Sequence, residues 1–185
     1  MATIDKKVYT YADYADLPVG APYELIGGDL IMTPAPTPFH QIVAKRFHRL
    51  LLMLEDRGLG QVISAPIDVY FSETETYQPD LIFIARDRYA IIGDQHIEDA
   101  PDLIVEILSP STAYYDLRHK MRVYEQSGVK EYWIVDPIER TVELFGENEG
   151  RWSLIQSSVR SGSVRSRLYD SLEVVDVTIF APIEG

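Results

Sequence analysis

Asp102-Leu103-Ile104-Val105-Glu106-Ile107-Leu108 is the stretch that decides the fold. This nearly continuous aliphatic run is typical of a central strand that is buried on both faces of a sheet. With the two-residue alternation of a strand, Ile104, Glu106 and Leu108 share one face. An ionised carboxylate there is costly unless an ion pair or a metal compensates it. Glu106 is therefore part of a buried ion pair, lies where the strand leaves the core, or belongs to a functional site. We favour the site, because such groups tend to mark one.

The patterns around this strand predict a mixture of strands and helices. Two strand-like runs around Gly27-Gly28 read as a hairpin, and other strands are predicted at 61–64, 67–71, 80–84 and 131–136. Short strands follow, with 146–150 as a hairpin loop. Helices are predicted from a Thr10 cap to Tyr14, from a Thr37 cap to Gly58, and at about 115–126 before Gly128. We expect an α/β fold of the mixed α+β kind: a mixed β-sheet flanked by helices, with extra N- and C-terminal hairpins.

Composition limits the class of protein. The chain has 185 residues, no cysteine and a formal net charge of −12. The length suits one domain over 1–185, and neither an internal repeat nor a linker divides it. Disulfides, thiol catalysis and cysteine zinc sites are excluded. Neither a signal peptide nor a membrane span is recognised in the sequence, so a cytoplasmic location is expected. The negative charge argues against tight non-specific binding to DNA.

Asp80 is the second candidate site residue. It follows Pro79 and leads directly into the apolar run 81–84. Considered alone, it is better explained as a turn-capping residue. If its strand neighbours that of Glu106, however, both carboxylates can face one point. Hard oxygen ligands without histidine or cysteine favour magnesium or manganese over zinc.

Lys120 is the third candidate, on the helix that follows the central strand. Leu117, Met121 and Tyr124 form the expected apolar stripe of this helix, and Lys120 borders it. Its stem could therefore run along apolar surface towards the sheet. An i,i+4 ion pair with Asp116 is the alternative, and it is preferred if Lys120 is considered alone.

Other reactive residues give weaker signals. The four histidines show no metal-ligand spacing. His40, near a helix start, is either a hydrogen-bonded structural residue or a substrate contact, and we favour the first. The sequence holds neither a Gly-x-Ser-x-Gly elbow nor a phosphate-cradling glycine loop. Trp133 and Trp152 are expected in the core or at an interface.

A longer pattern of motifs resembles a known family. It comprises Tyr23-Glu24-Leu25-Ile26, His40, Pro79-Asp80-Leu81, Val105-Glu106-Ile107-Leu108-Ser109-Pro110-Ser111-Thr112, Asp116, Lys120, Tyr124, Gly128-Val129 and Glu131-Tyr132-Trp133-Ile134-Val135-Asp136-Pro137. The chain thereby resembles, from about Tyr11 to its end, the large bacterial family of restriction-endonuclease-like proteins long catalogued as a domain of unknown function. Glu-Ile-Leu-Ser-Pro-Ser-Thr and Glu-Tyr-Trp-Ile-Val-Asp-Pro are specific together.

The resemblance implies the PD-(D/E)XK nuclease fold, with Asp80 and Glu106 as the two motif acids. Leu108 fills the position where the plain motif has lysine, and Lys120 is the implied replacement. Glu24 matches an acidic position associated with the same site. The implied activity is a Mg²⁺-dependent DNA endonuclease, with Mn²⁺ as another metal.

The implied ligands of the metal are Asp80, Glu106 and the Ile107 carbonyl. DNA is the implied substrate, and a homodimer is expected because one site cuts one strand. Two alternatives stay open: a catalytically weak or inactive nuclease-fold protein that acts as a binding or regulatory module, and an RNA or nucleotide hydrolase that uses the same site.

Overall fold

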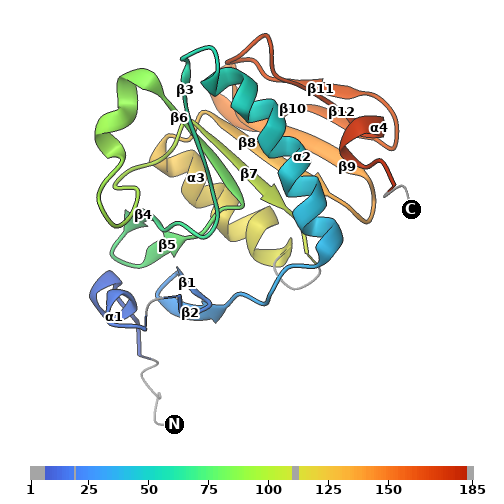
Figure 1. The fold of residues 1–185 in the computed structure, drawn as a ribbon. Helices are drawn as coiled ribbons and strands as arrows, with labels where there is room; N and C mark the ends of the chain where they lie inside the picture. Colours follow the sequence, from blue (N-terminus) through green and yellow to red (C-terminus); the bar gives the residue numbers. More distant parts are fainter. Residues whose placement is uncertain (1–6, 19, 110–112, 183–185) are drawn as a thin grey trace.

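A six-stranded mixed sheet forms the centre of the molecule (Figure 1). The structure, a computed structural model, describes residues 7–18, 20–109 and 113–182. The strand order is β10-β9-β8-β7-β6-β3, in which only β7 and β8 pair in parallel. The strands are β3 (Gly60–Ser64), β6 (Leu81–Ala85), β7 (Leu103–Ile107), β8 (Glu131–Asp136), β9 (Thr141–Asn148) and β10 (Arg151–Val159).

Strand β7 is buried on both faces, as its sequence predicts. It pairs with β6 in the antiparallel register Ile82↔Ile104. Leu103, Val105 and Ile107 belong to one hydrophobic cluster, whereas Ile104 belongs to the other. The two clusters lie on opposite faces because successive side chains of a strand alternate. The sheet therefore needs a cover on each face.

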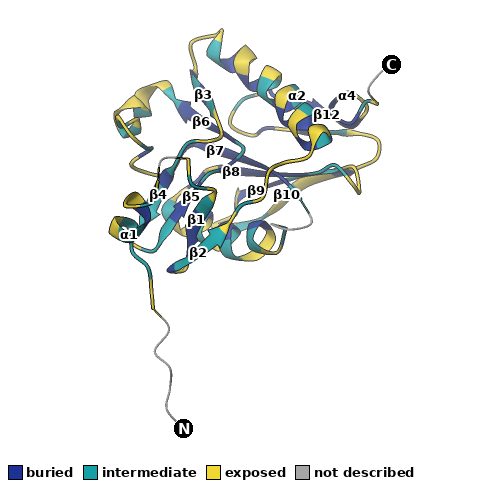
Figure 2. Cartoon of the chain, turned by 60° about the horizontal axis from the view of Figure 1, so that its bottom comes forward, coloured by how far each residue is buried: buried dark blue, intermediate teal, exposed yellow. Residues whose placement is uncertain are grey.

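Helix α2 (Pro38–Glu55) covers one face. The Thr37 hydroxyl accepts the His40 N–H at 3.2 Å and caps the helix, as expected. Val43, Phe47, Leu51 and Leu54 are fully buried. In Figure 2 the outer side of α2 is exposed, and the strands beneath are buried. Gly58 follows in the left-handed region (φ 70°), where glycine has no Cβ to clash. The predicted start of this helix is therefore confirmed, whereas its last residue is Glu55, three residues before Gly58.

The other face is covered by η2 (Tyr115–Lys120) and α3 (Met121–Ser127). This segment differs from the single α-helix predicted, because η2 is π-helical. Its wider turn changes which side chains face the sheet. Leu117 is 41% exposed, so its predicted place in the apolar stripe was wrong, whereas Asp116 and Lys120 are buried. Tyr124 packs against Tyr132 with 4.9 Å between ring centroids.

A second sheet, β2-β1-β5-β4, lies at the carboxyl end of β7 together with α1 (Figure 1). Its elements are α1 (Tyr11–Ala15), β1 (Tyr23–Ile26), β2 (Asp29–Met32), β4 (Val69–Ser72) and β5 (Glu75–Tyr77). The hairpin predicted around Gly27-Gly28 is thus confirmed. The strand predicted at 67–71 begins at Val69, because residues 65–68 form a bend and a loop before it.

The C-terminal part adds a small hairpin and a helix. The elements are β11 (Ser163–Arg165), β12 (Glu173–Val175) and α4 (Asp176–Ile179). The Arg46 guanidinium of α2 donates to the Ile179 carbonyl at 3.1 Å, which fixes α4 beside α2. The hairpin loop predicted at 146–150 is shorter than expected, because β9 continues through Asn148.

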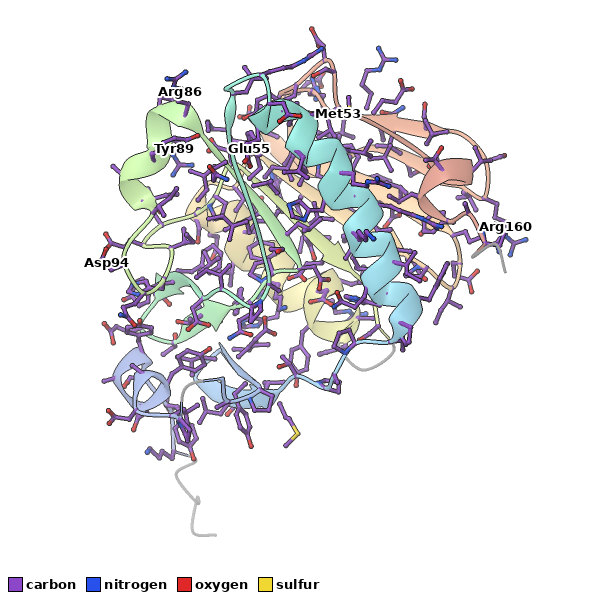
Figure 3. The ribbon with its side chains drawn as sticks, viewed as in Figure 1. Met53, Glu55, Arg86, Tyr89, Asp94 and Arg160 are labelled. Carbon is purple, nitrogen blue, oxygen red and sulfur yellow. The ribbon has the colours of Figure 1, made fainter. Side chains whose placement is uncertain are left out.

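At the far margin, η1 (Arg86–Ile91) and the loop after it carry Arg86, Tyr89 and Asp94 outwards (Figure 3). None of the helices in the described part of the chain is both long enough and apolar enough to cross a membrane.

Candidate active site

The ends of the two central strands bring Asp80 and Glu106 together. Asp80 directly precedes β6, and β6 pairs with β7, so the predicted neighbourhood of the two strands is confirmed. The Ile107 N–H donates to Asp80 Oδ2 at 2.7 Å. Asp80 is thereby tied to the residue that follows Glu106, and its negative charge acts on the Glu106 carboxyl.

The Lys120 ammonium lies at the centre of a buried acidic cluster. Its Nζ is 2.9 Å from Glu24 Oε1, 3.1 Å from Glu106 Oε1 and 3.1 Å from Asp116 Oδ1. All four side chains are buried. The helical ion pair with Asp116 that the sequence left as an alternative is therefore present, but it is only one of three contacts. We call Glu24, Glu106, Asp116 and Lys120 the lysine cluster.

Three other groups hold the lysine cluster in place. The Tyr124 hydroxyl donates to Glu106 Oε1 at 2.8 Å, and the Gln78 N–H donates to Glu24 Oε1 at 2.7 Å. The Tyr132 hydroxyl donates to the backbone carbonyl of Asp116 at 3.1 Å, within the π-helical turn. The lysine cluster is thus assembled from both sheets and from η2.

The charges in the lysine cluster shift two pKa values. Burial raises the pKa of Glu106 well above its ordinary value, and the negative charges of Asp116, Asp80 and Glu24 add to it, against the opposing effect of Lys120. Burial alone would lower the pKa of Lys120, but Glu106, Glu24 and Asp116 raise it well above the ordinary value. Lys120 is therefore a permanent cation at neutral pH and not a proton acceptor.

His40 lies at the more open side of the site. Its Nε2 is 3.3 Å from Asp80 Oδ2, and the Asp80 side chain is 19% exposed. Burial lowers the pKa of His40, but the hydrogen bond and charge of Asp80, with smaller contributions from the Ile107 backbone and Asp116, together raise the net pKa. The sequence predicted a hydrogen-bonded His40 but did not identify Asp80 as its partner. It also did not place Tyr124 and Asp116 at the site, although the four-residue spacing from Asp116 through Lys120 to Tyr124 is visible in the sequence.

The side chains and carbonyls at the site decide which metal ion it could hold. Within residues 7–18, 20–109 and 113–182, the structure contains no group of three or more His, Asp or Glu side chains placed to hold an ion. The donors that fit are the Asp80 and Glu106 carboxylates and the Ile107 carbonyl, all hard oxygens of the kind that Mg²⁺ and Mn²⁺ prefer. A set of two carboxylates and one backbone carbonyl does not need a third acidic or histidine side chain.

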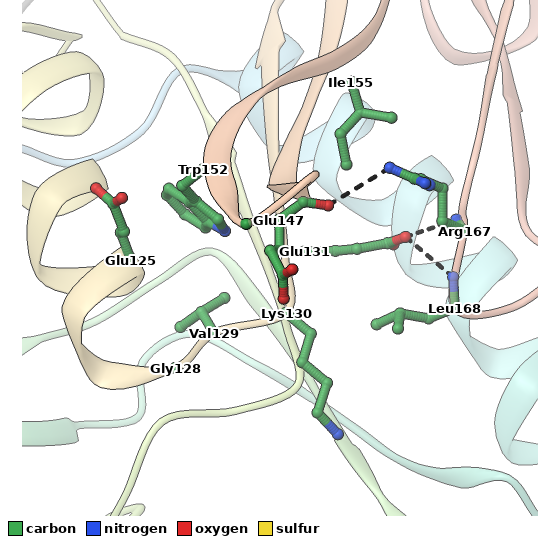
Figure 4. Close-up of a pocket in the computed structure, with 11 residues that line it drawn as sticks. Glu125, Gly128, Val129, Lys130, Glu131, Glu147, Trp152, Ile155, Arg167 and Leu168 are labelled. Carbon is green, nitrogen blue, oxygen red and sulfur yellow. Dashed lines mark hydrogen bonds between the residues drawn. The ribbon is translucent and has the colours of Figure 1, made fainter.

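A surface pocket of about 670 Å³ lies elsewhere, at the amino end of β8 (Figure 4). Trp152 lines it and stacks on Tyr132 at 6.3 Å. Buried Glu131 forms part of its floor, and there it accepts the backbone N–H groups of Arg167 and Leu168 at 2.6 Å and 3.1 Å. These bonds attach the C-terminal part to the sheet. The pocket is therefore separate from the acidic site, which lies at the carboxyl end of β7.

The fold is that of a solved nuclease-like structure. A crystal structure titled as a "putative nuclease belonging to DUF820" from Anabaena variabilis ATCC 29413 superposes with a TM-score of 0.76. Its sequence is 20% identical, and the match covers 93% of this chain and 97% of that one. At this identity the likeness shows the fold alone.

The family follows from the sequence match. Residues 11–177 match the Uma2 family, which is described as "Putative restriction endonuclease", and the chain belongs to this family. Two uncharacterized proteins of Synechocystis sp. PCC 6803 are similar. The protein sll1609 is 26% identical over 84% of this chain and 91% of its own length, and slr1290 is 24% identical over 72% and 70%.

Proposed function

We propose that the chain is a metal-dependent phosphodiester hydrolase that cuts DNA at the Asp80–Glu106 site. The observation that carries this proposal is the position of Lys120. The plain nuclease motif has a lysine where this chain has Leu108, yet the Lys120 ammonium lies 3.1 Å from Glu106 Oε1. A cation from the next helix thus stands beside the motif acid.

Each residue has a distinct part in the proposal. Asp80, Glu106 and the Ile107 carbonyl would hold Mg²⁺ or Mn²⁺, which lowers the pKa of a bound water and polarises the phosphate. Lys120 holds positive charge next to Glu106 and stabilises negative charge that develops on the phosphate oxygens. Glu24 orients Lys120 through their 2.9 Å contact. The substrate approaches from the side of Asp80, the more exposed of the two acids.

A nicking assay tests this proposal. Wild-type protein should convert supercoiled plasmid to the open circle with Mg²⁺ and not with EDTA. Asp80→Asn and Glu106→Gln should abolish nicking, and neither leaves a buried cation without a partner, since Lys120 keeps Glu24 and Asp116. Asp99→Asn, an exposed acid that pairs with Arg88, is the control and should retain activity. Full nicking by Asp80→Asn would remove this site from the reaction.

The alternative is a nuclease-fold protein that binds or regulates without cutting. It is favoured by Leu108 at the motif position and by the net charge of −12. The same assay separates the two proposals, since a binding module nicks plasmid with neither Mg²⁺ nor Mn²⁺.

A homodimer is part of the nuclease proposal, because cutting both strands of a duplex in one encounter needs two sites. A linear product from a dimeric species, identified by analytical ultracentrifugation, would support it.

A further inference from the structure

The outer side of the helix that carries Lys120 bears an aromatic and two arginines in a row. Tyr114, Arg118 and Arg122 follow one another at four-residue spacing, and all three are exposed. The Arg118 guanidinium lies 5.6 Å from the centroid of the Tyr114 ring, which confirms that these two side chains share a side of the helix. We call Tyr114, Arg118 and Arg122 the tyrosine–arginine surface.

The charges of this surface are unbalanced. Among the described residues, neither Arg118 nor Arg122 lies within ion-pairing distance of a carboxylate, whereas Lys120 contacts three. The two guanidinium groups therefore add positive charge to the outer side of this helix in a chain of net charge −12. Free guanidinium groups in such a chain are available to an external anion.

The aromatic residue narrows the class of that anion. Tyr114 is 67% exposed, which is high for a large aromatic side chain in a folded protein. A flat ring beside guanidinium groups is the combination by which proteins hold single-stranded nucleic acid: bases stack on the ring, and phosphates pair with arginine. A duplex conceals the faces of its bases, so the ring would gain little from it.

The position of the surface connects it to the proposed site. Tyr114 follows the end of β7 closely, at the end of the sheet where Asp80 opens to solvent. The π-helical turn directs Lys120 inwards and leaves Arg118 outside. One helix therefore faces the acidic site with one side and solvent with the other. We propose that the tyrosine–arginine surface binds a single nucleic-acid strand next to the site, an inference that rests on the proposed function because it names the form of its substrate.

Binding without cleavage tests the surface by itself. Fluorescence anisotropy with a fluorescein-labelled oligothymidylate in EDTA gives the affinity over a series of salt concentrations. The double variant Arg118→Gln/Arg122→Gln should reduce the slope of log K against log salt by about 1.4, from about 0.7 for each phosphate contact on a single strand. Tyr114→Ala should weaken binding by roughly 5- to 150-fold, the range for loss of one stacked base.

Two matched variants are the controls. Arg151→Gln removes an exposed arginine at the start of β10, at the opposite end of the sheet, and Tyr89→Ala removes an exposed tyrosine on η1 (Figure 3). Both should bind the oligonucleotide like wild type. Loss of affinity in the surface variants alone would support the inference. An unchanged salt slope in the double variant, or preference for a duplex of equal length, would overturn it.

The nicking assay keeps this inference distinct from the proposed function. If the protein nicks plasmid but the surface variants bind the oligonucleotide like wild type, the role of the tyrosine–arginine surface is rejected and the nuclease proposal stands. If the surface variants lose oligonucleotide binding but the wild-type protein does not nick plasmid, the nuclease proposal is rejected and the binding surface stands.

Discussion

At the scale of single residues, Lys120 has two roles, and its substitution is expected to impair both. It is the cation beside Glu106, and it is also the group that compensates three buried carboxylates. From the sequence alone, replacement by methionine is expected to keep the fold and the metal and to lose only cleavage. The structure changes that expectation, because methionine would leave three carboxylates in the interior without a cation.

Lys120→Met should therefore destabilise the metal-free protein by about 3–5 kcal/mol, the cost of leaving buried charges unpaired. Urea denaturation in EDTA measures this loss. Lys130→Met is the matched control: Lys130 is half exposed, and its partner Asp102 keeps Arg88 and the Ala85 N–H, so the loss should be smaller. A Lys120→Met protein as stable as wild type would show that the carboxylates do not need this ammonium.

Local sequence patterns predict only part of the lysine cluster. Glu106 stood out because a charge within an aliphatic strand is costly, and this argument needs only neighbours along the chain. The contact between Glu24 and Lys120 joins β1 to η2, which are distant in sequence. Local patterns carry no information on such a contact, and only the resemblance to a family brought Glu24 into the predicted site.

At the scale of elements, η2 marks the limit of periodicity. The stripe through Leu117, Met121 and Tyr124 assumes 3.6 residues per turn throughout. The π-helical turn breaks that assumption, exposes Leu117 and turns Asp116 inwards. No local propensity in the sequence signals this turn. The Tyr132 hydroxyl that bonds to the Asp116 carbonyl comes from β8, so tertiary contacts help to hold it.

Asp102 provides an element-scale prediction, because it joins the start of β7 to its neighbours. Its carboxylate accepts the Ala85 N–H at 2.8 Å and lies 2.6 Å from Lys130 Nζ. Burial raises the pKa of Asp102, but the Lys130 and Ala85 hydrogen bonds and Arg88 outweigh it, so the net pKa is lowered. A lowered pKa gives stability that is present above the unfolded value of 3.8 and lost as the pH falls through the folded value.

Asp102→Asn should therefore cost about 1–3 kcal/mol at neutral pH, and the difference from wild type should shrink in acid below the unfolded pKa. Urea denaturation at a series of pH values measures it. Asp99→Asn, which removes an exposed partner of Arg88, should have little effect at any pH. A difference between Asp102→Asn and wild type that stays constant into acid would contradict the assigned ion pairs.

At the scale of the whole molecule, the two sheets explain why the site lies at the end of β7. The central order of strands, with one parallel pair, could not be read from the sequence, because pairing partners depend on contacts between distant segments. The presence of a mixed sheet between helices could be predicted from the sequence, because a strand as apolar as β7 must be covered on both faces. The second sheet then brings β1 to the end of β7, and the acidic site forms at this junction.

A metal that binds at this junction should stabilise the whole molecule, since only the folded chain brings Asp80 and Glu106 together. At about 100 times its dissociation constant, Mn²⁺ should add about 2.7 kcal/mol, which for a chain of this size raises Tm by about 5–10 °C. Differential scanning calorimetry of protein freed of metal with EDTA measures the shift. Asp80→Ala should lose it and Asp99→Asn should keep it, because only Asp80 lies at the junction. An equal rise of Tm in wild type and Asp80→Ala would place the bound ion elsewhere.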